Sequence, residues 1–106
     1  MTTNGRKCFV SARIVDNGYK VGYMYRETPD DTFDSGWRFL AGNETNEYIN
    51  NANYIYLIEI EAINKYDNDV LRYLNSEIGS SYIRINTKTF ELDNKTKEIF
   101  VMKKEK

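Results

Sequence analysis

Residues 9–25, Phe-Val-Ser-Ala-Arg-Ile-Val-Asp-Asn-Gly-Tyr-Lys-Val-Gly-Tyr-Met-Tyr, carry the strongest fold signal in the chain. Two runs rich in β-branched and aromatic residues, Phe9–Val15 and Tyr19–Tyr25, flank Asp16-Asn17-Gly18. Asn-Gly is typical of a two-strand hairpin because both residues tolerate positive φ. In the second run every other residue is Tyr or Val, as on one face of a strand. We therefore expect an antiparallel hairpin near the N-terminus.

The remaining chain alternates short strand and helix patterns. Strands are expected at residues 54–60, 80–85 and 89–92, and short helices at 45–50 and 70–74, while 59–65 fits either the end of a strand or the start of a helix. Thr45 and Asp67 are suited to cap the two helices. A closing hairpin with its second strand at 98–102, followed by a basic tail, is expected over residues 88–106. These patterns predict one α+β domain over residues 1–106, with a mostly antiparallel sheet, an N-terminal hairpin and one or two short helices.

The composition excludes most familiar catalytic chemistry. The chain has no His, so a Ser-His or Cys-His nucleophile pair and a His metal ligand are excluded. Cys8 is the single Cys, which excludes an internal disulfide and a thiolate metal site within one chain. We therefore expect a non-enzymatic protein with no catalytic residues, no cofactor and no metal. A small enzyme that uses two of its carboxylates stays open as a third interpretation.

The charge is balanced, with 15 Lys and Arg against 16 Asp and Glu and a net charge of −1. This balance argues against a nucleic-acid partner, which requires a basic excess. No apolar run reaches membrane-spanning length, and no basic segment followed by an apolar one opens the chain. A cytoplasmic location and no membrane partner are the expectations, in keeping with the unpaired cysteine.

Residues 34–44, Asp-Ser-Gly-Trp-Arg-Phe-Leu-Ala-Gly-Asn-Glu, are the most distinctive stretch for function. A Trp beside an Arg is the pairing most often found where binding energy concentrates. Gly36 and Gly42 allow a compact loop or turn around this pair. Residues 27–34 just before it hold four acids and no base. The candidate partner-binding residues are Asp30, Asp31, Asp34, Trp37, Arg38 and Glu44.

These residues fit two interpretations. In the functional one, the acids face a basic partner and speed association by electrostatic steering, while Trp37 and Arg38 organise the loop. In the other, Trp37 is a core anchor and Arg38 pairs internally with Asp34 or Glu44, because a lone Trp in a small domain is usually largely buried. The sequence leaves both interpretations open.

Two strings, Val-Gly-Tyr-Met-Tyr-Arg-Glu at residues 21–27 and Asp-Ser-Gly-Trp-Arg-Phe-Leu-Ala-Gly at 34–42, resemble a known family. The family is number thirty-three in the series of bacterial immunity protein families that belong to polymorphic toxin systems. The likeness extends more weakly over roughly residues 10–85, and Asn43 departs from it where an acid is expected. The resemblance implies a cytoplasmic antitoxin, encoded beside a secreted toxin, that neutralises this cognate protein toxin by stoichiometric binding. The alternative is an intracellular domain that binds a small ligand or peptide in a Tyr-lined groove.

Overall fold

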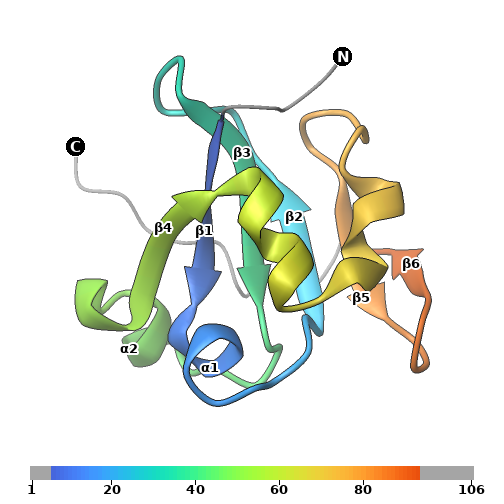
Figure 1. Cartoon of the computed structure of the whole chain (residues 1–106), viewed down its shortest axis with the longest axis horizontal. Helices are drawn as coiled ribbons and strands as arrows, with labels where there is room; N and C mark the ends of the chain where they lie inside the picture. The colour runs from blue at the N-terminus through green and yellow to red at the C-terminus, as the bar shows by residue number, and fades with distance from the viewer. Residues whose placement is uncertain (1–5, 94–106) are drawn as a thin grey trace.

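A computed structural model describes residues 6–93, which build a six-stranded mixed sheet with short helices on both faces (Figure 1). The elements are β1 (Lys7–Ser11), α1 (Ala12–Val15), β2 (Tyr23–Arg26), β3 (Asp34–Leu40), α2 (Asn46–Ile49), η1 (Ala52–Tyr54), β4 (Ile55–Glu59), η2 (Ile60–Lys65), η3 (Asn68–Tyr73), β5 (Ser81–Arg84) and β6 (Phe90–Leu92). The strand order is β4-β1-β3-β2-β5-β6. Strands β1 and β3 run parallel, and the other neighbouring pairs are antiparallel. The predicted α+β class and mostly antiparallel sheet are confirmed.

The predicted N-terminal hairpin was wrong. Residues 12–15 form α1 instead of extending the first strand, and the Ser11 hydroxyl accepts a hydrogen bond from the Arg13 amide to cap it. The Asn-Gly signal marks the turn after α1, where Gly18 has a φ of +77°. Strand β2 starts only at Tyr23 and pairs with β3 and β5. A local hairpin is excluded because β3 and β4 occupy both edges of β1.

The two predicted helix caps and the three later strands are confirmed within the described residues. The Thr45 hydroxyl accepts from the Tyr48 amide at 3.1 Å and caps α2. The Asp67 carboxylate accepts from the Asp69 amide at 3.0 Å and caps η3. Strands β4, β5 and β6 lie where strands were expected, and η2 assigns the ambiguous segment 59–65 to a 3₁₀-helix that follows β4. The second strand of the closing hairpin and the basic tail lie outside the described residues.

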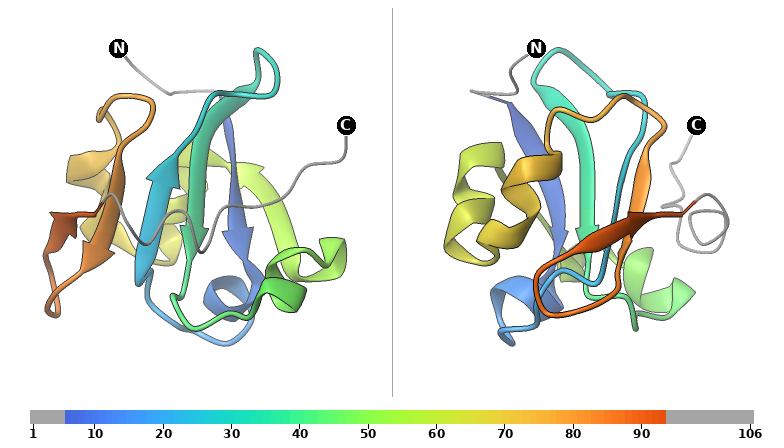
Figure 2. Two further views of the ribbon diagram at one scale, coloured as in Figure 1. Left: turned by 180° about the vertical axis from the view of Figure 1, so that it is seen from behind. Right: turned by 90° about the vertical axis from the view of Figure 1, so that its right-hand side faces the viewer.

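The two faces of the sheet are covered by different elements. Helices η2 and η3 lie over one face, and α2 lies on the other side of the sheet (Figures 1 and 2). The helix-covered face holds the larger core, with Cys8, Val10, Ile14, Val21, Met24, Trp37, Phe39, Ile60, Ile63, Val70 and Phe90. The opposite face holds Tyr23, Tyr25, Leu40 and Ile49. Val21 leaves the face that the alternation predicted for it because it precedes β2. Alternation along β3 then sends Trp37 to the helices and Arg38 to the opposite face.

Candidate functional site

The loop of residues 27–33 joins β2 to β3 at one end of the sheet and carries the acids that the sequence singled out. We refer to Glu27, Asp30, Asp31 and Asp34, together with Arg38 on β3, as the acidic corner. The loop is held by its own carboxylates. Asp34 accepts from the Asp30 amide at 2.8 Å, and Asp31 accepts from the Phe33 amide at 2.9 Å. Hydrogen bonds from backbone amides to Asp side chains of the same segment therefore fix the backbone of the loop.

Gly36 is required where β3 leaves this loop. Its φ is +90°, which favours glycine, and an added Cβ would lie 2.3 Å from the Glu27 carbonyl oxygen. The Glu27 amide donates to the Gly36 carbonyl at 2.9 Å across the same contact. The register between β1 and β3 shifts at this level, between Lys7 and Phe9. The close approach brings the Glu27 side chain next to the start of β3.

Arg38 is the fully buried centre of the acidic corner. Its two terminal nitrogens donate to the two Asp34 oxygens at 2.8 Å each, and its Nε donates to Glu27 at 2.7 Å. A carboxylate oxygen of Asp30 lies 3.9 Å away, and the guanidinium carbon lies 4.6 Å from the centre of the Phe9 ring. The buried cation is thus matched by carboxylates in bidentate geometry, which is what offsets its loss of hydration.

The pKa values of this pair move apart. Burial by itself would raise the pKa of the Asp34 carboxyl. The hydrogen bonds from Arg38 and from the Asp30 and Gly36 amides outweigh burial and lower this pKa to about 2. For Arg38, burial lowers the guanidinium pKa, and the bonds to Asp34 and Glu27 raise it well above its usual value. Both groups therefore stay ionised across the physiological range.

Asp34 is expected to make stability depend on acid pH. Its pKa is about 2 in the folded protein, below the ordinary Asp value of 3.8 that applies to the unfolded chain, so the unfolded state binds more protons in this window. Stability therefore rises with pH through the window and is lost as pH falls from about 4 to about 2, by about 2 kcal/mol for this group. Urea denaturation of the wild type and of Asp34→Asn between about pH 5 and about pH 2 measures it. The variant should be less stable at the upper end and less pH-dependent; equal slopes would contradict the assignment.

The six candidate residues lie in two environments. Asp30 and Asp31 are exposed, whereas Asp34, Trp37, Arg38 and Glu44 are buried. Trp37 lies under the helices, where its indole Nε1 donates to the Leu74 carbonyl at 3.0 Å. It therefore faces away from Arg38, its neighbour in sequence.

The predicted compact loop around Trp37 was wrong. Residues 34–40 form β3, which β1 and β2 flank on both edges, so the segment is held extended. Of the two internal partners considered for Arg38, the structure has Asp34. Glu44 lies beyond the far end of β3, where its carboxylate accepts from the Ala41 and Gly42 amides at 2.8 and 2.9 Å. The two ends of the 34–44 stretch therefore do not meet.

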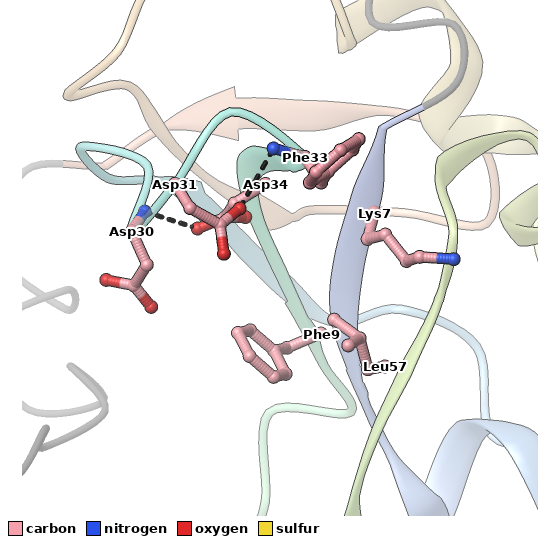
Figure 3. A pocket seen from close by; sticks show the side chains of 7 residues that line it. All are labelled: Lys7, Phe9, Asp30, Asp31, Phe33, Asp34 and Leu57. Carbon is pink, nitrogen blue, oxygen red and sulfur yellow. Dashed lines mark hydrogen bonds between the residues drawn. The ribbon is translucent and has the colours of Figure 1, made fainter.

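A pocket of about 190 Å³ lies beside the acidic corner, and sequence reasoning missed it. It is lined by Lys7, Phe9, Asp30, Asp31, Phe33, Asp34 and Leu57 (Figure 3). The Phe33 side chain is 67% exposed and that of Leu57 is 56% exposed. The signal available in the sequence was Phe33 itself, a lone aromatic residue in an acid-rich turn. An exposed apolar surface rimmed by polar and charged residues is typical of a protein interface.

The described residues offer little to other kinds of site. Within residues 6–93, no group of three or more His, Cys, Asp or Glu is arranged to hold a metal ion. Burial raises the pKa of the Cys8 thiol to about 12, so this thiol is protonated near neutral pH and is a poor nucleophile. In the same part of the chain, no helix has the length and hydropathy needed to span a bilayer.

Comparison with known proteins gives one finding. A family model described as the immunity protein Imm33 domain matches residues 8–93, which include every strand of the sheet after the first residue of β1. No curated protein and no solved structure matches the chain. The matched region contains the acidic corner and every residue that lines the pocket except Lys7.

Proposed function

The chain belongs to the Imm33 immunity protein domain family, and from this premise we propose that it neutralises a cognate bacterial toxin by binding the toxin directly. The observation that carries the proposed binding surface is the pair of exposed acids, Asp30 and Asp31, beside the exposed side chains of Phe33 and Leu57. Apolar contact supplies desolvated area, and the acids steer a basic partner. The complex is proposed to form in the cytoplasm, where an unpaired cysteine such as Cys8 stays reduced.

The candidate residues have different roles in this proposal. Asp30 and Asp31 contact the toxin. Asp34, Trp37 and Arg38 hold the loop and the strand behind it, so the surface exists before the partner arrives. A preorganised surface loses less conformational entropy on binding and so binds more tightly. Glu44 shapes the turn at the far end of β3 and is assigned no contact.

Two observations favour this proposal over the other interpretations. The proposed Tyr-lined groove loses Tyr23 and Tyr25, which are buried. Catalysis by paired carboxylates needs an acid with a raised pKa, whereas that of Asp34 is lowered. We therefore propose a non-enzymatic protein whose partner is another protein.

Binding to the toxin encoded beside its gene is the test. Titration calorimetry is expected to give a stoichiometric complex with a Kd below about 1 μM. The double charge reversal Asp30→Lys/Asp31→Lys is expected to weaken toxin binding at least about 100-fold, because each introduced lysine repels the basic surface that the aspartate attracted. Glu47→Lys/Glu91→Lys makes the same change of charge at exposed sites on α2 and β6 and should leave the affinity within about threefold.

The two outcomes that contradict the proposal differ. No complex at micromolar concentrations of both proteins removes direct neutralisation. If both double variants bind the toxin equally well, direct neutralisation stands, but the contact does not involve Asp30 and Asp31.

A further inference from the structure

We propose that two copies of this protein pair through the outer edge of β4, as antiparallel strands related by a two-fold axis at Leu57. Strand β4 lies at one end of the strand order, and β1 is its single neighbour among the strands that the structure describes (Figure 1). The inference is independent of the proposed function, since the partner is a second copy of this chain and not the toxin.

The edge of β4 lacks the features that keep edge strands of different molecules apart. Its sequence, Ile-Tyr-Leu-Ile-Glu over residues 55–59, has no Pro and no Lys, and its pairing with β1 runs without a bulge. The Leu57 side chain in the middle of the strand is 56% exposed. Natural sheets protect their edges with Lys, Pro or a bulge, because an apolar edge strand offers its backbone groups to another chain.

Alternate residues of β4 turn their backbone groups away from β1. The Ile60 amide donates to the Arg6 carbonyl at 2.8 Å just beyond the strand. Hydrogen-bonded pairs alternate along an antiparallel ladder, so Ile58 and Tyr56 bond to β1 in the same way. The backbone groups that point outward therefore belong to the residues between them, which are residues 55, 57 and 59.

Two of the outward groups are used by the helices that flank β4. The Ile55 amide donates to the Ala52 carbonyl. Glu59 is the N-cap residue of η2, and the carbonyl at such a position accepts the first helical hydrogen bond. Within residues 6–93, the groups left without a partner are the amide and carbonyl of Leu57, the Glu59 amide and the Ile55 carbonyl.

A second copy supplies the complementary groups in one register. When Leu57 lies opposite the partner's Leu57, these two residues exchange both hydrogen bonds, and each Glu59 amide faces the available Ile55 carbonyl of the other copy. A shift by two residues in either direction places one of the groups already in use opposite Leu57. The two-fold axis makes the contact isologous, as in most homodimers.

The side chains also fit in this register. Tyr56 and Ile58 pack against the larger core, so on the helix-covered face Tyr56 stands beside the partner's Ile58, a favourable pair of an aromatic and a β-branched residue. On the opposite face the two Leu57 side chains meet. Glu59 lies opposite the partner's Ile55, so the register places no like charges directly opposite each other.

The pairing leaves the acidic loop available to the toxin. The loop of residues 27–33 joins β2 to β3, and β1 separates both strands from β4 in the strand order. Phe9 lies directly opposite Leu57, so both side chains are on one face of the sheet. The two pockets of a dimer therefore open on the same face of the combined sheet.

The first experiment is sedimentation equilibrium of the full chain alone, from about 10 μM to about 1 mM. A monomer–dimer equilibrium is expected with a Kd on the order of 10–100 μM, which is weak because the contact is small. A chain that is still monomeric at about 1 mM would overturn the inference.

A charge swap at the two-fold axis tests the register. Leu57→Lys and Leu57→Glu each place like charges opposite each other, so each variant alone is expected to dimerise at least about tenfold more weakly than the wild type. An equimolar mixture of the two variants should recover a heterodimer, because residue 57 of one copy then meets the opposite charge. Leu92→Lys, at a residue 64% exposed on β6, is the matched control and should leave the Kd within about twofold. Dimers that form equally well from each Leu57 variant, or no recovery in the mixture, would contradict the pairing.

Amide hydrogen exchange of the wild type locates the contact without a substitution. The Leu57 and Glu59 amides are expected to exchange at least about threefold more slowly at about 1 mM than at about 20 μM, because the dimer protects them. The Tyr56 and Ile58 amides bond to β1 in both states and should not change. Exchange at Leu57 and Glu59 that is independent of concentration would overturn the inference. Neither experiment includes the toxin, so failure here leaves the proposed function standing.

Discussion

Arg38→Ala is expected to lower the free energy of unfolding by about 3–5 kcal/mol, because it leaves the buried Asp34 carboxylate without its counter-ion. Two further groups lose a contact: the Glu27 carboxylate gives up a 2.7 Å hydrogen bond, and the Phe9 ring gives up the guanidinium beside it. Urea denaturation near neutral pH, followed by far-UV circular dichroism, measures the change.

The control is an ion pair of the same type on the surface. Lys7→Ala breaks the pair between Lys7 and Glu59, whose side chains are both well exposed, and should cost less than about 1 kcal/mol. The double variant Arg38→Ala/Asp34→Ala should recover part of the loss, since it also removes the stranded carboxylate. A cost for Arg38→Ala no larger than that for Lys7→Ala would mean that Arg38 does not hold the acidic corner together.

Trp37→Ala is the second variant with a large expected effect, a loss of about 3–5 kcal/mol. The indole is fully buried, stacks on Phe39 with ring centres 5.8 Å apart, and donates to the Leu74 carbonyl just after η3. Its removal opens a cavity between the sheet and η3 and leaves that carbonyl without the indole hydrogen bond. Far-UV circular dichroism must report the unfolding, because Trp37 is the single Trp of the chain.

Trp37→Phe separates the packing of the ring from its hydrogen bond. It keeps an aromatic ring in the core and is expected to cost about 1–2 kcal/mol. The affinity of this variant for the toxin should stay within about threefold of the wild type, because a scaffold residue touches no partner. A large loss of affinity in a variant that remains folded would show instead that Trp37 acts at the interface.

Local patterns in the sequence predicted local structure well. The caps at Thr45 and Asp67 and the strands β4 to β6 follow from side-chain chemistry and alternation within a few residues. The partner of β1 could not be predicted in this way, because the choice among β2, β3 and β4 depends on contacts across the whole sheet. The two strings that carried the family resemblance proved to contain the neighbouring strands β2 and β3, which form the hairpin that the sequence had placed earlier in the chain.

The candidate site was predicted in part. Sequence reasoning found the acid-rich loop and one correct partner for Arg38. The sequence did not show that Asp30 and Asp31 are exposed whereas Asp34 is buried. The burial of each carboxylate depends on its distance from the Arg38 guanidinium, which is set by the fold. The pocket could not be predicted from the sequence because its wall combines residues of β1, β4 and the loop between β2 and β3, which are distant in the chain.

The pairing of β1 has a consequence for synthesis on the ribosome. Lys7 pairs with Asp34 and Phe9 pairs with Leu57, so the first strand finds its second neighbour only after more than half of the chain has been made. Such distant contacts must overcome the entropy of closing long loops before they stabilise anything. Nascent chains that stop before β4 are expected to stay unstructured and sensitive to proteases. A premature stop codon upstream of residue 55 would thus leave a cell with no partly active fragment.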